Sequence, residues 1–171
     1  LLRSQPVKNA LIFCNRKRDV DAVSKTLKAK GFDALALHGD MQQSYRMQTL
    51  EKFRNNEVKI LVCSDVAARG LDIQGLPFVF LYDVPTHAED YVHRIGRTGR
   101  AGREGRAITL ATSEDRKYLR AIEHVIGQPI PLMETGGQTN TSVGTPKISN
   151  AKAPEDTGEK TGEKTGEKTV E

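Results

Sequence analysis

The sequence predicts an α/β fold in which helices cover both faces of a parallel β-sheet. Short runs of apolar residues alternate along the chain with longer stretches in which apolar residues recur at helical spacing. The apolar runs show little alternation with polar residues, which is typical of strands buried on both faces of a parallel sheet. Because both features end near residue 131, we expect one domain over residues 1–131, which is a usual domain size.

The predicted elements follow one another as strand, helix, strand, helix. Five apolar runs have the length of strands and occupy residues 10–14, 34–37, 59–63, 78–82 and 106–111. Helical spacing occurs between them at 19–30, 44–54 and 87–95. Gly31 is expected to end the first helix, and Ser113 is expected to cap a last helix whose apolar face carries Tyr118, Leu119, Ile122, Val125 and Ile126. Ligands of such sheets bind at the carboxyl ends of the strands, so the loops that follow the strands are the candidate site.

Composition excludes several classes of protein. The two cysteines, Cys14 and Cys63, each close a predicted strand, which indicates buried thiols in a reducing compartment and hence a cytoplasmic protein. The four histidines have no metal-binding spacing, so we expect no metal site within this chain. No apolar run approaches the roughly 18 residues of a membrane-spanning helix, and we expect no membrane partner.

Residues 132–171 differ from the rest of the chain. They contain no aromatic residue, and they include the sequence Thr-Gly-Glu-Lys three times in tandem, at 157–160, 161–164 and 165–168. Such a tract cannot bury enough apolar surface to offset the entropy of ordering, so we predict a disordered low-complexity tail. This tail is slightly acidic, whereas the chain as a whole has a net charge of +4. Residues 1–131 are therefore basic, which is compatible with a polyanionic partner.

The segment from residue 93 to residue 106 is the most informative part of the chain. Arginine recurs at every third position from Arg94 to Arg106, with glycine at 96, 99, 102 and 105. These glycines disfavour a continuous helix, because each costs about 1 kcal/mol in a helix interior. A disordered Arg-Gly tract that binds RNA loosely and a solvated charged face are two alternatives. Because a strand and a helix follow at once, we favour a structured loop whose arginines bind phosphate oxygens.

Four segments resemble the C-terminal motifs of DEAD-box RNA helicases, and they occur in the order that this family has. In chain order, motif IV is resembled by residues 11–17 (LIFCNRK) and motif IVa by residues 37–43 (LHGDMQQ), which Arg46 follows. Motif V is resembled by residues 64–72 (SDVAARGLD) and motif VI by residues 91–102 (YVHRIGRTGRAG). Four motifs within roughly 90 residues are a specific match, and the sequence just before motif VI is most similar to that of bacterial members. The resemblance implies a RecA-like helicase C-terminal domain of the P-loop NTPase type.

The resemblance also implies roles in ATP hydrolysis. In this family ATP lies between two RecA-like domains, and the second domain closes over the γ-phosphate with arginine side chains. Arg97 and Arg100 match these catalytic arginine fingers. Asp72 matches the motif V acid that contacts the nucleotide ribose, with Gly70 beside it. An arginine finger can accelerate phosphoryl transfer by roughly a thousandfold or more.

RNA contacts in the family fall in the loops after the strands. By this resemblance Gly39, Asp40 and Ser64 are candidate RNA-binding residues, and Asn15 is a further one. Contacts of this kind are made mostly to phosphate and ribose, so binding should be largely independent of RNA sequence. Weaker candidates are Arg16, Gln43, Arg46 and Arg69. Arg46 and Arg69 could equally form ion pairs with Asp40 or Asp65.

By the same resemblance, His93 and Arg94 match residues that tie motif VI to the partner domain and couple domain closure to RNA. The sequence contains no Gly-x-x-x-x-Gly-Lys-Ser/Thr loop, no Asp-Glu-Ala-Asp and no Ser-Ala-Thr. Without these motifs nothing in the chain holds magnesium or positions the attacking water. ATP and Mg2+ are therefore expected to be bound mainly by an N-terminal RecA-like domain that this sequence lacks, and the chain alone is expected to be inactive.

Two functions remain open at this point. In the first, the chain is the C-terminal half of an ATP-dependent RNA helicase and acts beside its N-terminal domain. In the second, it is a stand-alone RNA-binding or regulatory module that retains the fold without ATPase activity. The chain begins with Leu1 rather than methionine, which favours a piece of a longer helicase. A DNA-directed helicase half is a third and weaker alternative.

Overall fold

The structure is a computed structural model, and it describes residues 2–4, 7–69, 71, 73–99, 104–133 and 142–144. Three predicted site residues, Gly70, Asp72 and Arg100, lie outside the described residues. So does most of the predicted tail.

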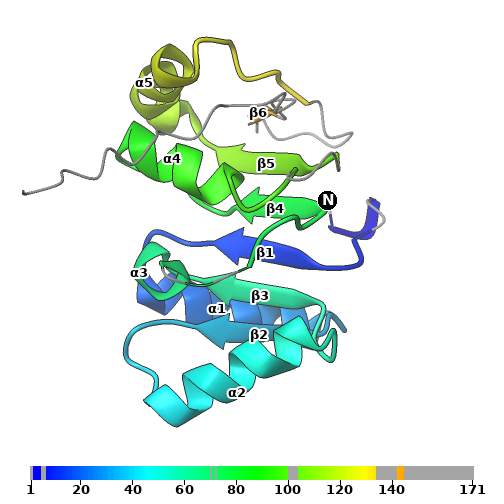
Figure 1. Ribbon diagram of the computed structural model, residues 1–171. Helices are drawn as coiled ribbons and strands as arrows, with labels where there is room; N and C mark the ends of the chain where they lie inside the picture. The colour runs from blue at the N-terminus through cyan, green and yellow to red at the C-terminus, as the bar shows by residue number, and fades with distance from the viewer. Residues whose placement is uncertain are drawn as a thin grey trace, which may run out of the picture.

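A six-stranded sheet forms the centre of the domain (Figure 1), with the strand order β2-β3-β1-β4-β5-β6. The strands are β1 (Ala10–Phe13), β2 (Ala34–Leu37), β3 (Ile60–Cys63), β4 (Phe78–Leu81), β5 (Arg106–Ala111) and β6 (Ser142–Gly144). The first five strands are parallel, and β6 is antiparallel to β5. Phe13 lies opposite Cys63 on β3 and Leu81 on β4, so these three strands end at the same level. The residues that follow them are therefore neighbours.

Helices lie on both faces of this sheet. They are α1 (Lys17–Ala29), α2 (Gln43–Arg54), α3 (Asp65–Ala68), α4 (Ala88–Ile95) and α5 (Arg116–Ile126), with short 3-10 turns η1 (Leu2–Ser4) and η2 (Ser113–Asp115). Within the described residues, no helix has both the length and the apolar character needed to span a bilayer.

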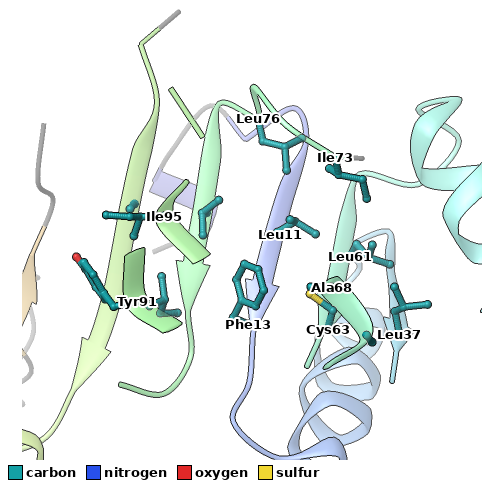
Figure 2. Close-up of a cluster of buried hydrophobic side chains, with 14 of the residues drawn as sticks. Leu11, Phe13, Leu37, Leu61, Cys63, Ala68, Ile73, Leu76, Tyr91 and Ile95 are labelled. Carbon is teal, nitrogen blue, oxygen red and sulfur yellow. The ribbon is translucent and has the colours of Figure 1, made fainter. Parts of the chain in front are cut away.

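Buried apolar side chains form two clusters, one on each face of the sheet. One cluster lies beneath α2 to α5, and Figure 2 shows it with these side chains labelled: Leu11, Phe13, Leu37, Leu61, Cys63, Ala68, Ile73, Leu76, Tyr91 and Ile95. The other cluster lies beneath α1 and contains Ile12, Val62 and Phe80. An apolar groove of about 690 Å³ runs beside α1 on this second face. Alternating strand residues thus feed two cores, as expected for a parallel sheet.

The predicted fold class is confirmed: a parallel sheet flanked by helices, with the five predicted strands in the predicted places. Apart from the two 3-10 turns, one helix and one strand were not predicted. Helix α3 has only four residues, too few for a helical period to show in the sequence. Strand β6 lies in the predicted tail and pairs with β5 at the edge of the sheet, where the backbone groups of an edge strand are available for pairing.

Two details of the last helix were wrong. The capping residue is Thr112 rather than Ser113, because η2 already begins at Ser113 and turns directly into α5. The Thr112 backbone N–H and its hydroxyl both donate to the Asp115 carboxylate, at 2.8 Å each, in a capping box. Val125 was assigned to the apolar face but is half exposed.

Thr112→Ala should therefore destabilise the domain, by about 1 kcal/mol, which is a typical value for a lost N-cap. Ser113→Ala is the matched control, since Ser113 caps nothing in this structure. Urea unfolding followed by circular dichroism measures both variants. Equal unfolding free energies for Thr112→Ala and the wild type, or a larger loss for Ser113→Ala, would contradict the assignment of the cap.

Candidate functional site

A polar cavity of about 450 Å³ lies at the carboxyl ends of the central strands, between α3 and α4. Charged side chains of both signs dominate its wall, which is formed by Phe13, Asp65, Ala68, Arg69, Glu89, Asp90, His93, Arg94 and Arg97. Parallel α/β sheets bind their ligands at this end of the strands. The cavity is therefore the candidate site that the fold itself favours.

Arg94 is the best-connected side chain of the site, and it is 1% exposed. Its Nε and Nη2 donate to the two carboxylate oxygens of Asp65 at 2.8 and 2.6 Å, which is the bidentate geometry of a strong ion pair. Nη2 also donates to Asn15 Oδ1 at 2.7 Å, and Nη1 to the carbonyl of Asp83 at 3.1 Å. The guanidinium lies over the Phe13 ring, 5.5 Å from its centre. We call Arg94, Asp65, Asn15 and Asp83 the Arg94 cluster.

The sequence of α4 explains why Arg94 is buried while its neighbour is not. Tyr91, Arg94 and Ile95 lie three and four residues apart, so they share the face of α4 that packs on the sheet. His93 lies on the exposed side, at the rim of the cavity. Burial raises the pKa of Tyr91 to about 12, so its hydroxyl stays protonated at neutral pH.

Arg97 follows the end of α4 and reaches the cavity wall. Its Nη1 donates to the Leu71 carbonyl at 2.9 Å, and this is the one hydrogen bond that its side chain makes to a described residue. Its backbone carbonyl accepts the N–H of Leu76 at 3.1 Å, which fixes the chain at this point. Most of the guanidinium donors of Arg97 are thus unpaired within the described residues. An arginine held in this way can bind an anionic oxygen that enters the cavity.

Two segments that follow Arg97, at residues 98–99 and at residue 105, lie against each other. Thr98 is buried and donates its hydroxyl to the Leu76 carbonyl, and Gly99 has φ of 69°, which favours glycine. Gly105 returns the chain to the same place: a Cβ at position 105 would collide with Thr98 Oγ1 and with the backbone of Gly99. The chain at Gly105 therefore lies directly against Thr98 and Gly99.

The predicted RNA-binding residues follow three adjacent strands. Gly39 and Asp40 are exposed after β2, Ser64 is half-buried after β3, and Asn15 follows β1. The Ser64 N–H donates to the Leu37 carbonyl at 3.3 Å, which joins the ends of β2 and β3. These residues thus lie along one edge of the sheet.

Two of these residues also have partners within the domain. Lys17 Nζ lies 2.5 Å from Asp40 Oδ2, and its hydrogen bond holds the pKa of Asp40 below the ordinary value. Asn15 accepts from Arg94 and donates its Nδ2 to the Val84 carbonyl at 2.9 Å. Asn15 thus stabilises the fold, in addition to any contact that it makes with a ligand.

The ion-pair partners suggested for Arg46 and Arg69 were wrong. Arg69 Nη2 lies 3.3 Å from Asp90 Oδ1, and Arg46 Nη1 donates to Gln43 Oε1 at 3.2 Å. Asp65 already pairs with Arg94, and Asp40 pairs with Lys17. Arg69 is mostly exposed, at 70% of its side chain, so its pair is weak.

Sequence reasoning missed the roles of Asp65 and Asp83. A usable signal was present, because each stands within two residues of the end of an apolar strand, as Asn15 does. Polar residues at these positions share one edge of the sheet and can meet.

The two thiols do not take part in the site. Cys14 and Cys63 are buried and free, and burial raises the pKa of Cys14 to about 12 and that of Cys63 still further. Both are thus protonated and unreactive at neutral pH. Among the described residues, no group of three or more metal-ligating side chains is placed to hold a metal ion.

Gly105→Ala should destabilise the domain by about 1–3 kcal/mol, the usual cost of overpacking, because the added methyl meets a buried side chain and backbone. Gly39→Ala is the matched control: Gly39 is exposed, and a Cβ there meets no atom within 4 Å. Thermal unfolding of both variants tests the close approach. A Gly105→Ala protein as stable as the wild type would show that residue 105 does not lie this close to Thr98 and Gly99.

Known proteins show the same sequence pattern and architecture. Residues 1–102 match the family model described as helicase conserved C-terminal domain. The ATP-dependent RNA helicase CshA of Listeria monocytogenes is 42% identical over 164 residues, which cover 93% of this chain and 32% of that protein. The chain thus spans about a third of the length of this relative.

Solved structures agree with this assignment. The Escherichia coli DEAD-box protein SrmB, bound to the regulator of ribonuclease activity A, superposes with a TM-score of 0.70 at 36% identity, over 75% of this chain and 76% of that one. Domain 2 of the DEAD-box helicase Mss116p, bound to an RNA duplex, gives 0.65 at 31% identity, over 72% of this chain and 49% of that one. With the motif segments at the carboxyl edge of a RecA-like sheet, the chain belongs to the helicase conserved C-terminal domain family and is a C-terminal domain of the DEAD-box type.

Proposed function

We propose that this domain is the C-terminal half of an ATP-dependent RNA helicase and that it supplies arginine fingers to ATP bound against an N-terminal RecA-like domain. The observation that carries the proposal is Arg97, which lies on the cavity wall with most of its donors unpaired among the described residues. Arg100, three residues further along the sequence, is the second finger in this proposal.

The described residues fit the γ-phosphate of ATP. Negative charge develops on the transferring phosphoryl group, and an arginine fork placed there stabilises it. Two of the three carboxylates on the cavity wall are paired, Asp65 with Arg94 and Asp90 with Arg69, and Glu89 is the third. Gly70 and Asp72 would contact the nucleotide ribose.

The same residues do not fit Mg2+. The described part of the chain has no cluster of carboxylates free to ligate a cation, and the sequence lacks the phosphate-binding loop and the Asp-Glu-Ala-Asp motif. Mg2+ and the attacking water belong to the N-terminal domain in this proposal. His93, exposed at the rim of the cavity, is placed to meet that domain.

RNA is the proposed second ligand, and it binds along the edge formed by Gly39, Asp40, Ser64 and Asn15. Their positions after β2, β3 and β1 give a continuous polar edge beside the cavity. The related domain of Mss116p, which is bound to an RNA duplex, supports this choice. Backbone contacts from such a surface read no base sequence.

Arg97→Ala should abolish the ability of the chain to restore ATP hydrolysis to a missing half. The chain is mixed with the part of Listeria CshA outside the matched region, and RNA-stimulated phosphate release is measured. We expect restored turnover with the wild type and a loss of roughly a thousandfold with Arg97→Ala, because the finger contributes mainly in the transition state. Arg120→Ala, an exposed arginine on α5, is the control and should retain activity.

Two results would contradict this proposal. One is RNA-stimulated ATP hydrolysis by the purified chain alone. The other is restored turnover that Arg97→Ala leaves unchanged. RNA binding without any restored turnover would instead favour the stand-alone RNA-binding module.

The RNA surface has its own test. Labelled single-stranded RNAs of equal length and scrambled sequence should bind the chain with dissociation constants within about threefold of one another, since the contacts go to the backbone. Competition with DNA of the same sequence should be weak if the ribose hydroxyl is contacted. A strong preference for one RNA sequence, or equal competition by DNA, would refute this form of binding.

A further inference from the structure

We propose that Arg94 is a positioning residue that joins the RNA edge to the ATP cavity inside this one domain, and that it does not contact the partner domain. This inference rests on the proposed function for what the two surfaces bind. The motif resemblance implies that Arg94 ties motif VI to the partner domain and couples domain closure to RNA. The geometry differs from the first of these roles, because the partners of Arg94 all lie within this domain.

Burial excludes a direct contact between Arg94 and another domain. The side chain is 1% exposed, and four of its five N–H groups donate to Asp65, Asn15 and Asp83. Its planar face is covered by Phe13. A partner could reach the guanidinium only by breaking these contacts.

Toward the RNA edge, Arg94 holds two of the proposed RNA-binding positions. Asn15 Oδ1 accepts from Arg94, and the Asn15 backbone N–H donates to Asp83 Oδ2 at 3.0 Å, so the β1 and β4 ends are bonded to each other as well. Asp65 is the first residue of α3 and directly follows Ser64. Fixing Asp65 therefore fixes the backbone at Ser64.

Toward the cavity, Arg94 is connected to Arg97 through the end of α4. The Arg97 N–H donates to the Arg94 carbonyl at 3.2 Å, and the Thr98 N–H donates to the Ile95 carbonyl at 3.1 Å. One hydrogen-bonded turn thus connects Arg94 to Arg97, so a displacement of the Arg94 backbone also displaces Arg97. One side chain therefore sets the relative position of Asn15, Ser64 and Arg97.

Only arginine satisfies this set of partners. Its fork reaches a carboxylate, an amide oxygen and a carbonyl at once, whereas a lysine ammonium is a point charge on a flexible stem. Replacement of Arg94 leaves the Asp65 carboxylate, whose side chain is 24% exposed, without its cation. The ends of β1, β3 and β4 then lose their common connection.

Hydrogen exchange in the intact chain tests this inference without reference to any ligand. In Arg94→Met we expect the Asn15 and Arg69 amides, which donate to Asp83 and Asp65, to exchange about tenfold or more faster, as in local opening. The Ala10 and Ile60 amides, at the opposite ends of β1 and β3, serve as the internal reference, and their exchange rates should stay at the wild-type values. Arg120→Met is the control variant.

Arg94→Lys keeps the test decisive if Arg94→Met does not fold. It retains the positive charge near Asp65 but cannot reach Asn15 and Asp83 together, so Asn15 should still exchange faster. Uniform acceleration of exchange at all four amides would show that Arg94 contributes only to global stability. No change at any of them would show that Arg94 stabilises none of these contacts. Either result overturns the proposal.

RNA affinity as a function of salt gives the second readout. With a fluorescein-labelled oligouridine, we expect the folded Arg94 variant to bind about tenfold more weakly, with the wild-type slope of log affinity against log salt, because a buried arginine neutralises no phosphate. A slope smaller by about one would show that Arg94 contacts phosphate directly. Unchanged affinity despite faster exchange would show that the cluster does not serve the RNA edge. If the wild-type chain binds no RNA, the proposed RNA function fails, and the exchange pattern alone decides the structural part.

Discussion

The carboxyl edge of the sheet is held together by one buried cation, Arg94. Arg94 comes from α4 and bonds to residues that follow β1, β3 and β4, three strands that end at the same level. A buried charge is costly unless it is paired and hydrogen-bonded. Asp65 neutralises Arg94, and the remaining partners are a side-chain amide and a backbone carbonyl. The arrangement thus satisfies a buried charge and at the same time fixes the loops that carry the site.

Two neighbouring arginines of the same motif have opposite surroundings. The Arg94 side chain is buried and almost fully hydrogen-bonded within the domain, whereas the Arg97 side chain lies on the cavity wall with one hydrogen bond to a described residue. They lie three residues apart at the end of α4, and the helix ends between them. The first therefore suits a structural task and the second suits a ligand. A regular repeat of arginine in the sequence thus contains side chains with different roles.

Much of the fold could be predicted from the sequence, because buried parallel strands and amphipathic helices leave strong patterns over many residues. The motif segments lie at the carboxyl edge of the sheet, and the ligand contacts assigned to them stay predictions. The partners of Arg94 could not be predicted, since Asp65 and Asn15 are 29 and 79 residues away and meet it only because β1 lies between β3 and β4. The same cause explains the wrong partners for Arg69: Asp65 is already bonded to Arg94. Short elements such as α3 and the Thr112 cap depend on single hydrogen bonds, for which the sequence has no periodic signal.

In the proposed function, this domain is half of a site that ATP and RNA complete. The most direct measurement is the affinity of this chain for the remaining part of Listeria CshA, determined by analytical ultracentrifugation with and without RNA and ADP–beryllium fluoride with Mg2+. We expect tight association only when both ligands are present, and its loss in Arg97→Ala, because the γ-phosphate analogue joins the two halves through that side chain. Association of equal strength without nucleotide, or none under any condition, would contradict it.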